Sequence, residues 1–427
     1  MDALLDGRYA DWVRAHETGV ITLASAVVML VAWYWCICIF PPADDVLNFY
    51  KNAECIKDGM LPYVDFTFEF PPFALVFFMI PSLFTSDVNT YAVLFALMIA
   101  VFVVLTQYFL MRICERVKIS RILVAVLFLV LTLIYFSEAV KKFDTIVMFT
   151  TVLALWFVVS GRRKSAYTML AVGAFIKMYP ALFIPLLMIF DIVENRRKGA
   201  VDALYGVLCC LGVAALAFVP LMIAGVPLSD SLSFITFHAD RGFHVESFVA
   251  VLIEFASLFG ITEFELVPIH YTFDIDNPLC DILQPVWLQV CLAVFIIVFA
   301  GIVYSMYRRG TGADELGRFR MMVVCFGIVT VVFLLTNKVF STQYMIWLIP
   351  IAALLCVTGE RNVSGASTLV FLLAQVFTYF ITKYDSGTEN FIVSNMLRDS
   401  VLIIALAMML VYMLYRRGPL AGPGVRV

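Results

Sequence analysis

Charged residues are rare in this chain, and the ones that could do chemistry gather in a few short segments. Asp44 and Asp45 follow Pro41 and Pro42 at the end of a long apolar run. A carboxylate at the edge of a membrane is desolvated on one side, which favours the protonated form and suits a general base. The pair therefore predicts a catalytic carboxylate, with an ordinary charged helix end as the alternative.

A stiff segment rich in aromatic and acidic residues comes next, with Tyr63, Asp65 and Glu69 between Pro62 and Pro72. Aromatic faces pack against sugar rings, and carboxylates accept hydrogen bonds from hydroxyl groups. The segment predicts one wall of a sugar-binding site. The alternative is a rigid turn that leads back into the membrane.

Lysines occur within or beside apolar runs, where burying their charge costs free energy. Lys142 and Asp144 lie in a very short turn between two apolar runs, and Lys177 lies within a third run. A lysine at membrane depth needs an opposite charge or a polar cavity. A bound phosphate would meet that need, so we expect Lys177 and Lys142 to bind phosphate. An internal ion pair between Lys177 and Asp144 is the alternative.

A long polar segment later in the chain contains Arg241, His244 and Glu246. Arginine is suited to bidentate contact with phosphate, and Glu246 is placed to orient Arg241 or a hydroxyl group. A lone histidine is more often structural or exposed than catalytic. Solvation of a loop is the plainer interpretation of all three residues.

A second, shorter polar turn contains Lys338, Gln343 and Tyr344 between two apolar runs. We expect these side chains to face the same cavity as Lys177. The alternative is an interfacial anchor, because Tyr and the nearby Trp347 favour the membrane boundary. No cluster of His, Cys or acidic residues has the spacing of a metal site, so we expect no cofactor and no metal.

The elements that must position these residues are membrane helices, because 63% of the chain is hydrophobic and only 14% is charged. Short loops rich in Arg and Lys should be cytoplasmic by the positive-inside rule. The mixed polar segments then share the opposite, extracytoplasmic face. The basic loops are 112–121, 162–164, 196–198, 308–320 and 416–417.

Apolar runs long enough to cross the ~30 Å hydrocarbon core are frequent. The run 166–192 must be two short helices that meet near Lys177, because Pro180 breaks a helix and one helix would put the next basic loop outside. This gives about twelve membrane helices with both termini cytoplasmic. The candidate spans are 19–40, 88–111, 121–138, 143–160, 166–192, 200–224, 285–307, 319–336, 341–357, 366–382 and 398–415.

The predicted fold class is an all-α polytopic membrane protein made of one integral membrane domain, 1–427. It has a first external loop at 41–87, a second external loop at 225–285 with an amphipathic helix near 246–260, and a cytoplasmic tail at 416–427. The apolar segment 70–84 is too short to span and should be re-entrant or interfacial. Cys55 and Cys280 fall in the two external loops, where a disulfide between them is possible.

Together these segments place acids and cations around one cavity at the membrane boundary. Cations would stabilise a leaving phosphate, and one carboxylate would deprotonate an acceptor hydroxyl. A phosphate leaving group needs no protonating acid, so one carboxylate is enough. The chemistry predicted is transfer from a lipid-linked phosphate to a hydroxyl group of a glycolipid or glycan acceptor, with membrane lipids as further partners and no nucleic acid.

The order of these motifs resembles the GT-C membrane glycosyltransferases of family 87, which include polyprenyl-phosphate-mannose-dependent mannosyltransferases. The resemblance implies a GT-C fold, a polyprenyl-phosphate sugar donor, an inverting hexosyltransferase and a catalytic role for Asp45, with Asp44 as the alternative base. The motifs are Asp45 to Tyr50, Pro62-Tyr63, Asp65-Phe66, Glu69-Phe70-Pro71-Pro72, Lys142-Phe143-Asp144, Lys177-Met178-Tyr179-Pro180, Arg241-Gly242 with Glu246-Ser247, and Lys338 with Ser341-Thr342-Gln343-Tyr344, Trp347 and Pro350.

The residues assigned to each task follow from this interpretation. Lys177, Arg241, Lys338 and Lys142 would bind the donor phosphate. Sugar and acceptor would be bound by Tyr63, Asp65, Glu69, Asp144, His244, Glu246, Gln343 and Tyr344. We expect a bacterial inner-membrane protein with an extracytoplasmic site. A secondary transporter of a polar or anionic substrate, or a lipid-binding protein of polymer assembly, is the alternative.

Overall fold

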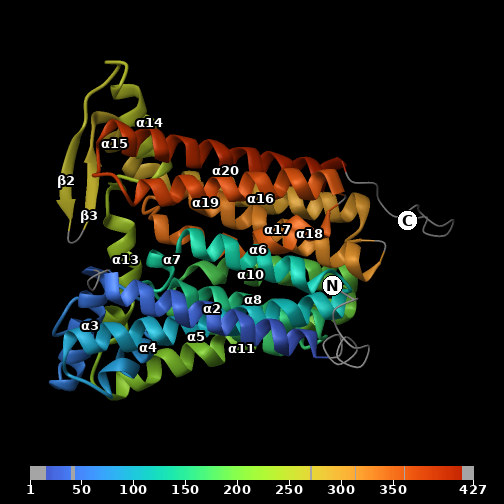
Figure 1. The fold of residues 1–427 in the computed structure, drawn as a ribbon, viewed down its shortest axis with the longest axis horizontal. Coiled ribbons are helices and arrows are strands. Elements are labelled where there is room, and N and C mark those ends of the chain that lie inside the picture. The colour runs from blue at the N-terminus through green and yellow to red at the C-terminus, as the bar shows by residue number, and fades with distance from the viewer. Residues whose placement is uncertain (1–15, 40–43, 270–271, 313, 360, 416–427) are drawn as a thin grey trace.

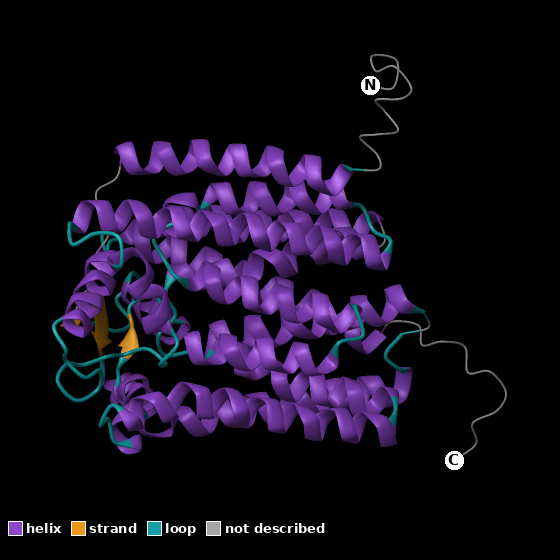
Figure 2. Cartoon of the chain, turned by 90° about the horizontal axis from the view of Figure 1, so that it is seen from below, coloured by secondary structure: helices purple, strands orange, loops and turns teal. Residues whose placement is uncertain are grey.

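The computed structural model describes residues 16–39, 44–269, 272–312, 314–359 and 361–415. The predicted tail at 416–427 lies outside the described residues. Figure 1 shows long helices lying side by side, with short helices and a small sheet gathered at one end of the bundle. Figure 2 shows the same division from a second direction.

Helices occupy every one of the predicted membrane segments. Among the described residues, seven helices are long and apolar enough to cross a membrane by length and composition. The prediction of about twelve spans therefore stays a prediction. The long elements are α2 (Glu17–Ile39), α5 (Val88–Val117), α6 (Arg121–Ile134), α8 (Asp144–Val159), α9 (Arg163–Ile176), α10 (Phe183–Glu194), α11 (Arg196–Ile223), α16 (Trp287–Arg309), α17 (Glu315–Thr336), α18 (Leu348–Thr358), α19 (Arg361–Ile381) and α20 (Glu389–Tyr415).

The predicted break near Lys177 is confirmed. Helix α9 ends at Ile176, Lys177 is extended with φ −156° and ψ 134°, and the short 3-10 helix η1 (Tyr179–Leu182) leads into α10. Pro180 occupies the start of η1, where its missing N–H does no harm. The break brings the Lys177 side chain to the end of the bundle that carries the external loops.

The described residues of the basic loops lie together at the opposite end of the bundle. Arg121 pairs with Glu17 at the start of α2, and Arg116 at the end of α5 lies 3.9 Å from Glu315 at the start of α17. Figures 1 and 2 both place the start of α2 and the end of α20 at this end. The basic loops and the mixed polar segments thus lie at opposite ends of the bundle in the described structure. The cytoplasmic assignment of the basic end stays a prediction.

The first external loop consists of α3 (Asp44–Lys57), a turn and α4 (Ala74–Ser82). Helix α4 has nine residues, too short to span a bilayer, in keeping with the predicted re-entrant or interfacial segment. Its Phe78 stacks on Phe49 of α3 at 4.3 Å, and Phe143 meets Phe49 edge-on at 5.4 Å. This aromatic cluster fixes α3 against the turn that carries Lys142.

The second external loop is more structured than the sequence analysis predicted. The amphipathic helix is confirmed as α14 (Phe248–Ser257), but the loop also has a three-stranded antiparallel sheet in the order β1-β3-β2. These strands are too short for their alternation to stand out in the sequence. The remaining elements are α12 (Leu228–Ser231), α13 (Ser233–Asp240), β1 (Phe243–His244), β2 (Glu265–Ile269), β3 (Thr272–Asp276), α15 (Pro278–Leu283) and η2 (Gln284–Val286), with α7 (Phe136–Ala139) and η3 (Thr342–Trp347) in other loops.

Candidate active site

A cavity of about 460 Å³ opens at the end of the bundle formed by the external loops. Its wall combines α3, the turn before α8, the break after α9, the second external loop and the polar turn that leads into η3. Segments far apart in the sequence therefore meet here, as the sequence analysis predicted. Nine of the fourteen predicted site residues line this cavity: Asp45, Glu69, Lys142, Lys177, Arg241, His244, Glu246, Gln343 and Tyr344.

Asp45 lies in the first turn of α3 and forms an ion pair with Lys142. The Asp45 side chain is 30% exposed, so the carboxylate faces the cavity and is not sealed behind the pair. One turn along α3, Asn48 donates a hydrogen bond to Glu69 Oε1 at 3.3 Å. Asn48 was missed by the sequence analysis because a polar residue on a short amphipathic helix gives no signal. The side chain of Asp44, the alternative base, lies outside the described residues.

Lys177 combines both interpretations of its sequence position. Its Nζ donates to Asp144 Oδ1 at 2.7 Å, which is the internal ion pair weighed above, and the same side chain lines the cavity. The ammonium also lies 4.6 Å from the ring centroid of Tyr344 and 4.9 Å from that of Phe143. Asp144 is fully buried behind Lys177, so it acts on the cavity through the lysine and not by direct contact.

A stack of aromatic rings forms one side of the cavity. Trp347 lies between Tyr179 and Tyr344, with ring centroids 4.1 and 4.4 Å away. Trp347 Nε1 and Gln343 Oε1 are buried and have no hydrogen-bond partner within the described residues. Buried polar atoms usually have partners, so these two are available to a ligand of the cavity.

Arg241 reaches the cavity from the second external loop. Its Nε lies 3.3 Å from Asp274 Oδ1, and its Nη2 is buried without a partner in the described structure. Burial raises the pKa of the Asp274 carboxyl, while the Arg241 guanidinium acts against that rise. Asp274 was missed by the sequence analysis because only the pairing of β1 with β3 brings it beside Arg241.

His244 is fixed and neutral. Its Nδ1 lies 2.8 Å from the Phe340 carbonyl oxygen and its Nε2 lies 2.6 Å from Thr272 Oγ1. Burial lowers the pKa of the ring to about 3, and the nearby charge of Arg241 adds to this. The ring therefore joins β1, β3 and the turn before η3, as the structural interpretation of a lone histidine expected.

The remaining predicted residues lie apart from the cavity wall. The Lys338 carbonyl accepts a hydrogen bond from the His244 N–H at 2.8 Å, and its side chain does not line the cavity. Tyr63 donates to the Phe70 carbonyl and Asp65 accepts from the Leu61 N–H, both at 2.7 Å. Tyr63 and Asp65 thus shape the first external loop and border a neighbouring cavity of about 680 Å³ that Arg241 also lines.

Two predictions concern bound metal and disulfides. Within the part of the chain that the structure describes, no group of three His, Cys, Asp or Glu residues could hold a metal ion. The independence from metal stays a prediction. Cys55 and Cys280 are free thiols, and Cys280 is buried. The disulfide that the sequence left open is absent from the structure.

Comparisons with known proteins give one clear family. No curated protein matches the chain significantly. A solved structure of the oligosaccharyltransferase of Archaeoglobus fulgidus, tethered to an acceptor peptide, is similar with a TM-score of 0.43 and 13% identity. The likeness covers 96% of this chain, which spans 56% of the length of that enzyme. The model of glycosyltransferase family 87 matches residues 66–336, well over half of the chain. The chain therefore belongs to glycosyltransferase family 87.

Proposed function

We propose that this protein is an inverting glycosyltransferase that uses a polyprenyl-phosphate sugar, with mannose as the sugar. The acceptor is a lipid- or glycan-linked hydroxyl group, and the reaction takes place at the extracytoplasmic face of the membrane. Membership of family 87 supports the class of reaction. The donor, the sugar and the catalytic base are parts of the proposal.

The observation that carries the proposal is the composition of the cavity wall. Three carboxylates, those of Asp45, Glu69 and Glu246, line a single space of about 460 Å³ together with three cations, Lys142, Lys177 and Arg241. Partly buried cations concentrated in this way favour a phosphate, and the aromatic stack beside them suits a sugar ring. Lys338 lies outside this wall, so we assign the phosphate to the other three cations.

The reaction is a single displacement. The acceptor oxygen attacks the anomeric carbon while the bond from that carbon to the phosphate oxygen breaks. The electron pair leaves with the polyprenyl phosphate, whose charge Lys177, Arg241 and Lys142 stabilise. The acceptor proton passes to Asp45, and the configuration at the anomeric carbon inverts.

The ion pair between Asp45 and Lys142 gives this mechanism a starting state. Before substrate enters, each side chain neutralises the other. A donor phosphate in the cavity competes for Lys142 and releases the Asp45 carboxylate to accept a proton. The Asp45 carboxylate thus becomes a stronger base when the donor is bound, because it loses the charge of Lys142.

A transporter would need ionisable groups along its substrate pathway at mid-membrane depth. In the described residues, the cavity charges gather at the end of the bundle that bears the external loops. This distribution favours an enzyme over the transporter of a polar or anionic substrate.

The experiment that tests the proposal compares classes of donor. The protein in lipid nanodiscs receives radiolabelled mannose as either the polyprenyl phosphate or a nucleotide sugar, with a lipid extract of its host as acceptor. We expect a labelled glycolipid or glycan from the polyprenyl-phosphate donor alone. Transfer from the nucleotide sugar alone would overturn the proposed donor, and labelled mannose that crosses the bilayer unchanged would favour a transporter.

A further inference from the structure

Arg398 is a fully buried arginine in α20, the last helix of the bundle and outside the family match. Its Nε donates to Asp399 Oδ1 at 2.8 Å, and its guanidinium lies 3.9 Å from the ring centroid of Phe340. A buried guanidinium persists only where opposite charges and hydrogen-bond acceptors surround it. The partners of Arg398 therefore indicate what its buried charge does.

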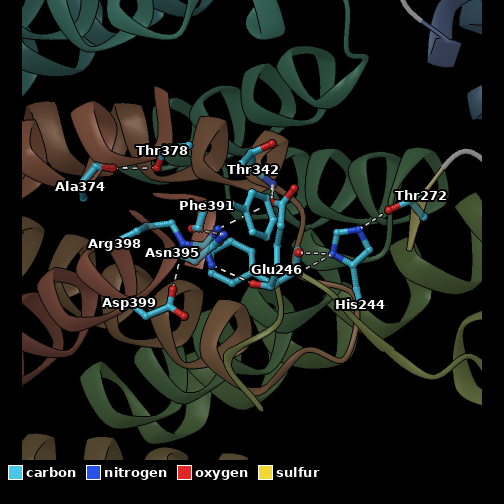
Figure 3. Close-up of polar contacts among 11 residues, drawn as sticks. His244, Glu246, Thr272, Thr342, Ala374, Thr378, Phe391, Asn395, Arg398 and Asp399 are labelled. Atoms are coloured by element: carbon cyan, nitrogen blue, oxygen red, sulfur yellow. Dashed lines mark hydrogen bonds and ion pairs between the residues drawn. The ribbon is translucent and has the colours of Figure 1, made fainter. Parts of the chain in front are cut away.

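The main partner of Arg398 across the fold is Glu246, which lies 152 residues away in the sequence. Arg398 Nη2 donates to the Glu246 carbonyl oxygen at 2.8 Å, and Nη1 lies 3.7 Å from Glu246 Oε2. The same Oε2 accepts the backbone N–H of Thr342 at 2.6 Å. Figure 3 shows Glu246 held between Arg398 and Thr342, with His244 on its other side.

The Glu246 side chain is 14% exposed and lines the cavity. A carboxylate in such a place is costly without a compensating charge. Arg398 supplies that charge without occupying the cavity itself. It also contacts Phe340, so one guanidinium joins α20, the second external loop and the polar turn before η3.

Other acids near Arg398 do not replace Glu246 as its partner. Glu254 on α14 is buried, and both of its carboxyl oxygens lack a hydrogen-bond partner among the described residues. Burial, and then the charge of Glu246, raise the pKa of Glu254 to about 9, so Glu254 is neutral at pH 7. The charge of Arg398 is therefore shared between Asp399 and Glu246.

We propose that Arg398 is a positioning residue of the cavity: it holds the Glu246 carboxylate at the wall, where this carboxylate accepts hydrogen bonds from hydroxyl groups of the sugar or the acceptor. The inference rests on the proposed function and deepens it. It names Glu246 as the group that recognises a hydroxyl and Arg398 as the residue through which α20 contributes to the site.

The test uses a charge-balanced variant, because Arg398→Met alone would leave Asp399 buried without a partner. Arg398→Met with Asp399→Asn removes the local pair, Glu246→Gln removes the carboxylate, and a triple variant combines them. A matched control, Arg163→Met with Asp191→Asn, removes a 2.9 Å ion pair at the opposite end of the bundle. Each variant is assayed for kcat and KM with the polyprenyl-phosphate donor.

We expect the Arg398 variant and Glu246→Gln each to lower kcat/KM by about 10- to 150-fold, the effect of losing one charge-assisted hydrogen bond to substrate. The triple variant should be no more than about threefold worse than Glu246→Gln, because Arg398 acts through Glu246. The control should keep the kcat/KM of the unmodified protein. Losses that multiply in the triple variant would overturn the inference, since Arg398 would then act independently of Glu246.

A second readout needs no substrate. Hydrogen exchange of the Thr342 amide reports directly on the contact with Glu246 Oε2. We expect faster exchange at Thr342 in the Arg398 variant, while peptides from α17 exchange as before. Unchanged exchange at Thr342 would overturn the positioning role. A lack of sugar transfer by the unmodified protein would refute the proposed function alone, because exchange is measured without donor or acceptor.

Discussion

Replacing Lys177 separates the two roles that its position combines. Its Nζ lies 2.7 Å from Asp144 Oδ1, and the two side chains are 13% and 0% exposed. Lys177→Met leaves the Asp144 carboxylate buried without its partner, which costs about 3–5 kcal/mol of stability. Adding Asp144→Asn removes the stranded charge, so the double variant should lose only about 1–2 kcal/mol, the value of an unmade hydrogen bond.

Activity should not return with stability. If Lys177 also binds the donor phosphate, the double variant still lacks one charge-assisted hydrogen bond of about 1.5–3 kcal/mol. This corresponds to a kcat/KM about 10- to 150-fold lower than that of the unmodified protein. Thermal unfolding in detergent measures the first effect, and sugar transfer in nanodiscs measures the second. A double variant that regains both stability and the full transfer rate would show that Lys177 serves only as the partner of Asp144.

Three further predictions follow from the structure. The pKa of His244 falls from 6.5 to about 3 on folding, so the unfolded chain takes up this proton first as the pH drops. The free energy of unfolding should therefore decline below about pH 6.5 by up to ~1.4 kcal/mol per pH unit. Thermal unfolding of His244→Gln should show a shallower decline with pH. Gly173→Ala places a Cβ 2.4 Å from Thr150 Oγ1 and 3.1 Å from the Pro180 ring, so it should destabilise the protein by about 1–3 kcal/mol, whereas Gly212→Ala, with open space around it, should change the unfolding temperature little. Treatment with a chelator should leave sugar transfer unchanged, and a loss of activity that added divalent ions restore would refute the metal-independent mechanism.

Local signals in the sequence predicted much of the framework. The break at Lys177 followed from Pro180 and from the charge rule for the next basic loop, and the structure confirms it. The amphipathic pattern of 246–260 likewise predicted α14, because the spacing of apolar residues along a helix is visible in the sequence alone. The sorting of charges predicted one polar end of the bundle, because a membrane keeps charged residues at its two faces.

Contacts between distant segments could not be predicted in this way. The partners Arg398 and Glu246 are 152 residues apart, and Arg241 meets Asp274 only because β1 pairs with β3. The direction of the Lys338 side chain depends on backbone geometry that no short motif reveals. Spacing therefore identifies which segments meet at the cavity, while the pairing of their side chains requires the fold.

The central claim is that Asp45 takes the proton of the acceptor hydroxyl. The measurement that tests it most directly is the rate of mannose transfer from a polyprenyl-phosphate donor by Asp45→Asn in nanodiscs, with Asp58→Asn, an exposed acid of the same external loop, as the control. A general base contributes about 10²- to 10⁴-fold, so we expect Asp45→Asn to lose transfer by that factor while Asp58→Asn keeps the full rate. Transfer by Asp45→Asn at the rate of the unmodified protein would contradict the account and place the base elsewhere, with Asp44 as the first residue to test.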